Sequence, residues 1–164
     1  MVILNDRQIN QKIKRLSIQI LENNYTENTI YLAGINNNGL GFAKLLMSTL
    51  KKISDVDVRL INITLNPAKP TAGEVNISVP EEELKNKVII LVDDVANTGR
   101  TIFYAFKPFL QILTKKIEIA VLVDRKHKSF PIKVDYVGLS LATTLKNNIT
   151  VDIKKSKERQ VLLE

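Results

Sequence analysis

The first stretch of the chain has the hydrophobic spacing of an amphipathic helix. Within residues 6–23 the apolar positions recur at intervals of four, three and four, which places them on one helical face. These positions are Ile9, Ile13, Leu16 and Ile20. Asn5 and Gln8 have the spacing of a capping box at the start of such a helix. The pattern predicts a helix with one buried face.

The rest of the chain alternates short apolar runs with helical patterns. The runs predict strands at 29–33, 55–65, 88–92, 117–123, 135–139 and 149–153, with a short outlying strand at 75–79. Further helices are predicted at about 40–52 and 101–113, and Pro108 should kink or break the second one. Strands that alternate with helices indicate an α/β domain with a mostly parallel sheet. We expect one domain over residues 1–164.

Two segments interrupt this alternation. Residues 34–41 contain three of the six glycines and a run of asparagines, so a loop is expected between the strand at 29–33 and the next helix. Residues 66–80 contain prolines and a glycine, which predicts a longer loop insertion.

One strand ends in a group of residues with the chemistry of a ligand site. Asp93 and Asp94 follow the apolar run at 88–92, and a small-residue loop then leads into the helix that begins near Thr101. Ligands of open α/β sheets bind beyond the carboxyl ends of the strands, and a helix N-terminus attracts anions. The pattern suits a sugar phosphate and matches neither a Walker A loop nor a dinucleotide fingerprint. The alternative is an acidic pair that only caps the helix.

Composition narrows the class of protein. The 164 residues are 45% hydrophobic and 25% charged, as in a soluble globular domain. No apolar run approaches the roughly 20 residues that span a bilayer, and no signal peptide is evident, so a cytoplasmic location is expected. The absence of cysteine excludes disulfides and thiolate metal sites. The net charge of +7 fits either a polyanionic partner or a lysine-rich solvated surface.

The segment 90–102, Ile-Leu-Val-Asp-Asp-Val-Ala-Asn-Thr-Gly-Arg-Thr-Ile, resembles the phosphoribosyl-diphosphate (PRPP) motif of type I phosphoribosyltransferases. The resemblance implies that Asp93 and Asp94 are catalytic, accepting hydrogen bonds from the ribose hydroxyls and stabilising a cationic transition state. It implies a second set of residues that wraps the 5′-phosphate through backbone N–H groups and hydroxyls. That set is Ala96, Asn97, Thr98, Gly99, Arg100 and Thr101.

The whole chain is similar to the bifunctional pyrimidine operon attenuator/uracil phosphoribosyltransferase family. The similarity is carried by the segments 62–65 (Asn-Ile-Thr-Leu), 120–132 and 135–138 (Asp-Tyr-Val-Gly). It implies the type I phosphoribosyltransferase fold: a central sheet flanked by helices, with a small, reduced hood whose lid insertion is at 66–80. It also implies transfer of ribose 5-phosphate from PRPP to uracil, giving UMP and diphosphate. Mg²⁺ would be carried by PRPP near Asp93 without a direct protein ligand set.

The resemblance assigns three further groups of residues. The diphosphate loop would be Gly34, Ile35, Asn36, Asn37, Asn38 and Gly39, where family members end in Lys-Thr-Arg-Gly but this chain has no cation. The base would be read by Asp124, Arg125 and the loop 142–146. A possible RNA-binding face would contain Lys14, Arg15, His127, Lys128 and Lys133.

Three hypotheses follow. In the first, the chain is a pyrimidine phosphoribosyltransferase that acts as a homodimer or larger homo-oligomer. In the second, it binds PRPP, UMP or UTP, and RNA, as a regulator of pyrimidine genes with weak or no turnover. The uncharged loop at Asn36–Asn38 and the short 66–80 segment favour the second, whereas the intact motif at 88–102 favours ligand binding in both. The third is an α/β domain with a purely structural role.

Overall fold

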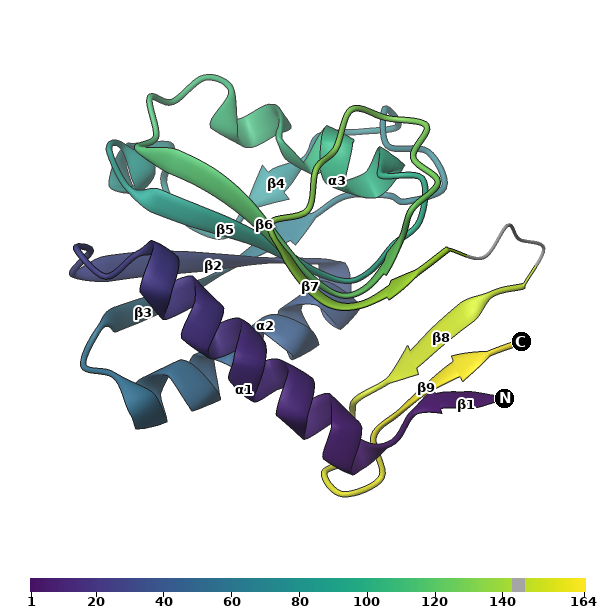
Figure 1. Cartoon of the computed structure of the whole chain (residues 1–164). Helices are drawn as coiled ribbons and strands as arrows, with labels where there is room; N and C mark the ends of the chain where they lie inside the picture. Colours follow the sequence, from purple (N-terminus) through teal and green to yellow (C-terminus); the bar gives the residue numbers. More distant parts are fainter. Residues whose placement is uncertain (143–146) are drawn as a thin grey trace.

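The computed structural model describes residues 1–142 and 147–164, and its centre is a six-stranded sheet (Figure 1). The strand order is β4-β3-β2-β5-β6-β7. Their bounds are β2 Thr29–Ile35, β3 Asp57–Thr64, β4 Asn76–Ile77, β5 Val88–Ala96, β6 Lys116–Arg125 and β7 Tyr136–Leu141. Only β4 pairs antiparallel, so the predicted α/β fold with a mostly parallel sheet is confirmed in the described part of the chain.

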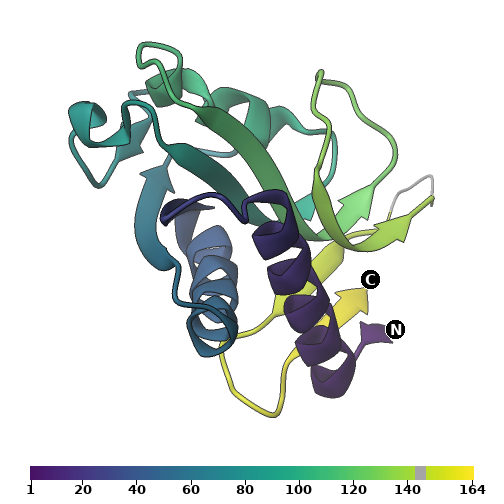
Figure 2. The same ribbon diagram turned by 60° about the vertical axis from the view of Figure 1, so that its left-hand side comes forward.

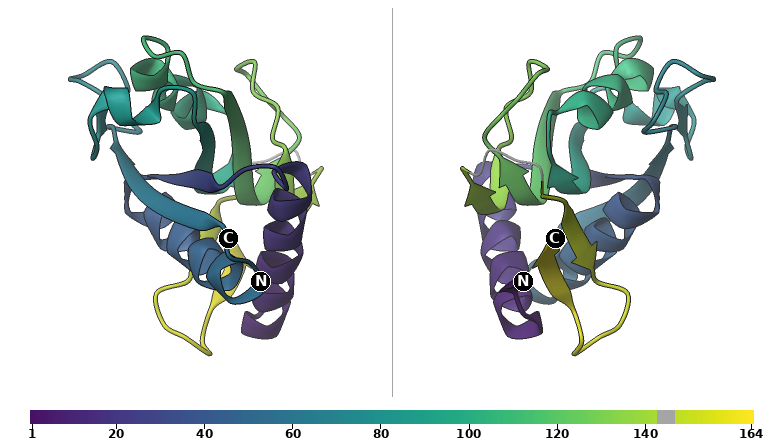
Figure 3. Two further views of the ribbon diagram at one scale, coloured as in Figure 1. Left: turned by 90° about the vertical axis from the view of Figure 1, so that its left-hand side faces the viewer. Right: turned by 90° about the vertical axis from the view of Figure 1, so that its right-hand side faces the viewer.

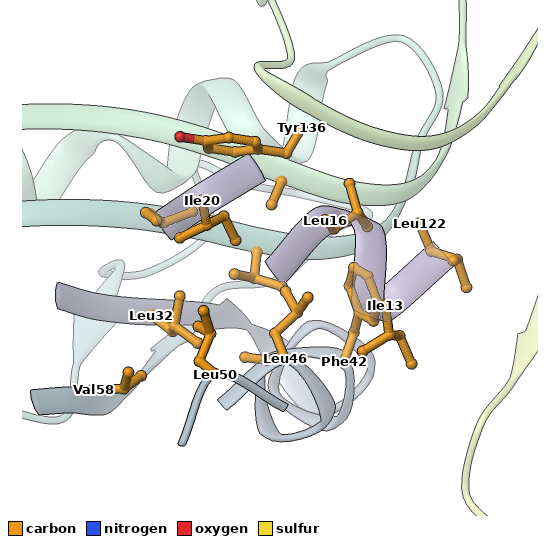
Figure 4. Close-up of a cluster of buried hydrophobic side chains, with 14 of the residues drawn as sticks. Ile13, Leu16, Ile20, Leu32, Phe42, Leu46, Leu50, Val58, Leu122 and Tyr136 are labelled. Atoms are coloured by element: carbon orange, nitrogen blue, oxygen red, sulfur yellow. The ribbon is translucent and has the colours of Figure 1, made fainter. Parts of the chain in front are cut away.

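Two long helices, α1 (Asp6–Asn23) and α2 (Asn36–Ile53), cover one face of this sheet (Figure 2). The predicted capping box of α1 is present, with Asn5 and Gln8 each accepting from the other's backbone N–H. The predicted apolar face is also correct, because all four of its members are at most 3% exposed. Three of them are drawn in Figure 4 among α2 and sheet side chains, namely Ile13, Leu16 and Ile20. Burial of this face therefore holds α1 on the sheet.

The opposite face carries shorter elements: η1 (Glu81–Leu84), α3 (Arg100–Ala105) and η2 (Lys107–Phe109). The predicted helix over 101–113 is wrong in length. Pro108 has no N–H to donate and its ring crowds the preceding turn, so the α-helix ends at Ala105 and a 3₁₀ turn replaces it. The predicted break is thus confirmed. No helix in the described ranges is long and apolar enough to cross a membrane.

The predicted loop at 34–41 is largely absent. Strand β2 continues to Ile35, and α2 begins at Asn36, four residues earlier than expected. Two glycines allow this tight packing, because a Cβ on Gly34 would lie 2.4 Å from the Leu40 Cα. A Cβ on Gly39 would lie 2.5 Å from the Val92 carbonyl oxygen. These glycines therefore let α2 press against β2 and β5, which leaves no room for an open loop.

A second, three-stranded sheet lies beside the N-terminal end of α1 (Figure 3). Its order is β1 (Val2–Leu4), β9 (Gln160–Leu163) and β8 (Ile149–Asp152), all antiparallel. The two ends of the chain meet here, since the Met1 ammonium donates to the Leu163 carbonyl over 2.8 Å. The sequence predicted β8 but neither β1 nor β9. Figure 1 shows this sheet at the side of the molecule where the parallel strands end.

Candidate active site

The acidic pair lies in the last part of β5. The strand was expected to stop at Val92, but its pairing with β6 continues from Asp93 opposite Val121 to Ala96 opposite Asp124. The two carboxylates are fixed by their own backbone: Asp94 N–H donates to Asp93 Oδ1 and Val95 N–H donates to Asp94 Oδ1, both over 2.9 Å. Asp93 is 8% exposed. The pair is therefore held rigidly at the carboxyl end of a central strand.

Burial raises the pKa of both carboxyl groups of this pair. It raises the pKa of Asp93 well above the ordinary value, and repulsion by the neighbouring Asp94 carboxylate raises it further. Burial also raises the pKa of Asp94, although hydrogen bonds from the backbone and from the Asn38 side chain offset part of this effect. Two buried carboxylates without a cation are costly to ionise together, so the site favours a ligand that brings positive charge or hydroxyl donors.

The loop after β5 is shaped to surround a small anion. Residues 97–101 and Asp93 line a hollow of about 360 Å³. Gly99 has φ +86° and precedes the first residue of α3, and Thr98 Oγ1 accepts from Arg100 N–H over 3.4 Å. The loop is supported from outside, because the Thr98 carbonyl accepts from Ser129 N–H at 2.9 Å and from Phe130 N–H at 3.2 Å. Five of the six predicted 5′-phosphate residues are thus brought together around one hollow, whereas Ala96 is buried and does not line it.

A second hollow of about 430 Å³ adjoins the first. Both hollows share Asp93, Asn97 and Thr101, so they are two parts of one cleft, which we call the acidic cleft. The second part is walled by the turn Asn36–Asn38 and by Pro67 and Ile149. Among the residues that the structure describes, no lysine or arginine lines this part. The turn expected to hold a diphosphate is therefore beside the acidic pair but carries no cation.

The turn at Asn36–Asn38 is locked by a polar clamp. Asn36 has φ +53°, and its Oδ1 accepts from Leu65 N–H at 3.0 Å. The Asn62 Nδ2 donates to the carbonyls of Gly34 at 3.0 Å and Asn36 at 3.3 Å. At the start of α2 no side chain caps the free N–H groups, and its first turn has no acidic residue. This helix end is therefore open to an anion that enters the cleft.

The acidic cleft suits Mg²⁺ delivered with a phosphate ligand. Mg²⁺ takes oxygen ligands and commonly uses one or two carboxylates together with substrate phosphates. Asp93 and Asp94 supply two adjacent carboxylates, and the ion would offset the repulsion that raises the pKa of Asp93. No group of three or more metal-binding side chains occurs in the part of the chain that the structure covers. Delivery of Mg²⁺ by its phosphate ligand, without a protein site of its own, stays a prediction.

The predicted base-reading residues lie next to the cleft without lining either described part. Asp124 and Arg125 end β6, and the Asp124 carboxylate is paired with Lys128 Nζ at 2.6 Å. The Lys128 Nζ also donates to the Arg125 carbonyl, and Arg125 donates to the Asn147 carbonyl. Most of the predicted loop 142–146 falls outside the described residues. The role of this region in base recognition stays a prediction.

The residues predicted to form an RNA-binding face have different surroundings in the structure. Arg15 Nη2 donates to the carbonyls of Val137 at 3.0 Å and Gly138 at 2.7 Å, so its guanidinium is held on β7. Lys128 is engaged with Asp124, whereas His127 and Lys133 are exposed. Lys14 lies on α1 and lines a separate cavity. A common RNA surface formed by these five residues stays a prediction.

Three residues of the cleft were not expected from the sequence. Asn62 was noted only as part of a family segment, yet it fixes the turn at the start of α2. Pro67 closes the cleft from the 66–80 segment, and its carbonyl accepts from Arg100 Nη2 at 2.7 Å. Ile149 reaches the cleft from β8. Asn62 could have been identified from its position in β3, but the contacts of Pro67 and Ile149 depend on tertiary packing.

Gly99→Ala is expected to destabilise the fold by about 1–2 kcal/mol and to weaken binding of ribose 5-phosphate. The φ of +86° is unfavourable for alanine, and its Cβ would lie 3.1 Å from the Ile132 side chain. Urea denaturation and calorimetry would measure the two effects. Gly73→Ala is the matched control, since its φ is +106° but nothing lies within 4 Å of the added Cβ. Equal affinity for ribose 5-phosphate in both variants would contradict the assigned role of the loop.

Known proteins are similar to this chain in sequence and in fold. A family model described as "Phosphoribosyl transferase domain" matches residues 2–155. The chain is 31% identical to Bifunctional protein PyrR of Pediococcus pentosaceus over 170 residues, which covers 98% of this chain and 96% of the relative. It is 35% identical to Bifunctional protein PyrR of Elusimicrobium minutum, covering 94% of this chain and 90% of that relative.

Solved structures of lower sequence identity have the same architecture. Hypoxanthine phosphoribosyltransferase of Trypanosoma cruzi has a TM-score of 0.75 and 17% identity, covering 99% of this chain and 94% of that chain. Hypoxanthine-guanine phosphoribosyltransferase from Bacillus anthracis has a TM-score of 0.72 and 22% identity, covering 85% of this chain and 81% of that chain. At these identities the likeness concerns the fold alone.

Proposed function

Because the chain belongs to the phosphoribosyl transferase family, and within it to the Bifunctional protein PyrR group, we propose that it transfers ribose 5-phosphate from Mg²⁺-PRPP to uracil. The products are UMP and diphosphate. The observation that carries this proposal is the acidic cleft, in which Asp93, Asn97 and Thr101 line both parts. A phosphate and a vicinal diol on one ligand can therefore be bound at the same time.

Different residues of the cleft bind different groups of PRPP. The backbone N–H groups of residues 97–101 and the Thr98 and Thr101 hydroxyls hold the 5′-phosphate. The carboxylates of Asp93 and Asp94 accept hydrogen bonds from the ribose hydroxyls and stabilise the positive charge that develops on the anomeric carbon. Asp93 and Asp94 would hold Mg²⁺ together with the diphosphate, and the ion would supply positive charge to the leaving group. The open end of α2 lies beside this leaving group and supplies N–H donors to it.

Further partners of this reaction are proposed by family likeness. Uracil is read near the ends of β6 and β7, from the side of the cleft where Asp124 lies opposite Ala96. RNA binding by Lys14, Arg15, His127, Lys128 and Lys133, and assembly into a homodimer or larger homo-oligomer, belong to the same proposal. Membership of the PyrR group suggests the RNA partner, whereas the homo-oligomer rests on the sequence resemblance alone.

A second function is favoured by one specific observation. The part of the acidic cleft that is walled by Asn36–Asn38 contains no lysine or arginine among its described residues. A charge-assisted hydrogen bond contributes roughly 1.5–3 kcal/mol, so a diphosphate group is bound less strongly here than a cationic turn would allow. A nucleoside monophosphate has no diphosphate group, so the missing cation does not weaken its binding. The second candidate is therefore a regulator that binds UMP with little or no turnover of PRPP.

Thermal unfolding with Mg²⁺ alone, Mg²⁺ with PRPP, and UMP tests both functions. A ligand at a hundred times its dissociation constant stabilises the fold by about 2.7 kcal/mol, which corresponds to a few degrees in melting temperature. The enzyme should be stabilised by PRPP and form UMP from PRPP and uracil. Stabilisation by UMP without any UMP formation from PRPP and uracil would support the regulator. If neither PRPP nor UMP raised the melting temperature, both functions would be wrong.

A further inference from the structure

A basic cavity lies away from the acidic cleft, between α1, α2 and the turn that joins β8 to β9. Its volume is about 670 Å³, which exceeds either part of the acidic cleft and falls in the range of small-molecule sites. Figure 2 shows the turn, in yellow, beside the ends of the two helices. From Asn36 to Lys52, α2 extends about 24 Å along its axis, so the two sites are at different ends of this helix.

The cavity has an excess of positive charge. Four basic side chains line it, namely Lys14, Lys52, Lys157 and Arg159, against one carboxylate, Asp6. Asp6 is already engaged, because it lies 3.6 Å from Arg159 Nη1 and accepts from Asn10 Nδ2 at 3.0 Å. Among the residues that the structure describes, none of the three lysines has an ion-pair partner within 4 Å. The wall therefore presents three uncompensated cations.

Two further features indicate a ligand rather than a solvated surface. Arg159 is only 14% exposed at its side chain, and its Nε is buried without a hydrogen-bond partner. The Nε itself is shielded from the cavity, so an anion there would contact Arg159 through other atoms of the guanidinium. Lys157 has φ +71°, which is unfavourable for a residue with a Cβ and holds the turn in a strained shape over the cavity.

The remaining lining combines hydroxyls with apolar surface. Ser48, Thr49 and Ser156 can donate hydrogen bonds to an anion, while Leu45 and Ile53 offer an apolar wall. Inorganic phosphate would use only the polar side of such a cavity. We propose that this cavity binds a small organic polyphosphate, with the phosphates on the lysines and Arg159 and the organic group on Leu45 and Ile53. The site is independent of the phosphoribosyltransferase activity.

Calorimetric titration with inorganic tripolyphosphate and with ATP tests the proposal. Both probes should bind, ATP more tightly. The triple variant Lys14→Gln/Lys52→Gln/Lys157→Gln should weaken both by roughly tenfold or more, since three charge-assisted contacts are lost. The matched control is Lys44→Gln/Lys51→Gln/Lys154→Gln, which removes the same charge from exposed positions of α2 and the turn outside the cavity. The control should bind both probes like the unmodified protein.

Four results would overturn the proposal. If neither probe bound, no such site would exist. Equal weakening in the two triple variants would show diffuse attraction to the basic surface, and equal affinity for ATP and tripolyphosphate would remove the apolar part of the site. A single-stranded RNA that depends on the cavity lysines more strongly than tripolyphosphate does would assign these residues to nucleic acid instead. Circular dichroism and melting temperature of each variant verify that it is folded.

Discussion

Replacing both Asp93 and Asp94 by asparagine is expected to lower kcat/KM for UMP formation by about 100-fold or more, while the protein stays folded. Asparagine keeps the side-chain oxygen that accepts from the backbone N–H of Asp94 or Val95. It removes the negative charge that accepts from the ribose hydroxyls and stabilises the cationic transition state. The stabilisation of the protein by Mg²⁺-PRPP in thermal unfolding should be lost together with activity.

The same double variant should be more stable than the unmodified protein at neutral pH. The pKa of Asp93 is raised in the folded state, so its contribution to stability is fully present below the unfolded-state value, about 3.9, and is lost as the pH rises through the folded-state value. This contribution declines as the pH rises to 7, so the buried pair makes the fold less stable at neutral pH than at acidic pH. We expect a melting temperature a few degrees higher for the variant at pH 7, with the difference disappearing below about pH 4.

Asp55→Asn is the control for both effects, because Asp55 is exposed and lies outside the acidic cleft. It should change neither kcat/KM nor the pH dependence of stability. If the double variant retained activity, the ribose would be bound elsewhere. If it lost activity and also melted at a lower temperature at pH 7, the loss would be due to unfolding, and the raised pKa of Asp93 would be contradicted.

Asn38→Arg is expected to raise kcat/KM for PRPP by about tenfold. The family pattern has an arginine immediately before the glycine that corresponds to Gly39, and Asn38 is exposed at the cleft, so the longer side chain can be accommodated. A charge-assisted bond to the diphosphate contributes roughly 1.5–3 kcal/mol, and a cation in the first turn of α2 costs about 0.3–1 kcal/mol through the helix dipole. The difference between these free energies corresponds to about one order of magnitude in kcat/KM.

Steady-state kinetics with varied PRPP measure this gain, and Asn38→Gln is the uncharged control of similar polarity. The gain should appear in PRPP-dependent steps, while the affinity for UMP changes much less because UMP has no diphosphate. An increase of the same size for Asn38→Gln would show that side-chain length rather than charge matters. No gain with Asn38→Arg would show that the end of α2 and Mg²⁺ already meet the needs of the diphosphate.

Periodicity was sufficient to predict the main sheet and α1 because each of these elements buries a regular apolar face. Ile9, Ile13, Leu16 and Ile20 illustrate this, since helical spacing alone selects all four buried positions. The strands β1 and β9 could not be predicted in the same way. They are three and four residues long and pair with each other across almost the whole sequence, so nothing local distinguishes them.

The acidic half of the site was predictable, but the wall opposite it was not. Asp93, Asp94 and the loop 97–101 are consecutive in the sequence, and one strand followed by one turn is enough to bring them together. The turn at Asn36 was expected to be an open loop because asparagine and glycine favour loops in general. What closes it is the close approach of Gly34 to Leu40 and of Gly39 to the distant Val92, together with the clamp from Asn62.

The pairing of β1 with β9 has a consequence for how the molecule is made. Ile149 of β8 reaches the cleft, and among the described strands β8 pairs with β9 alone, which in turn pairs with β1. During synthesis residues 2–4 must therefore wait until residues 160–163 have left the ribosome, and contacts of such large sequence separation form slowly. The parallel sheet can assemble earlier, but this wall of the cleft is completed last. A nascent chain thus acquires its fold before it acquires a finished site.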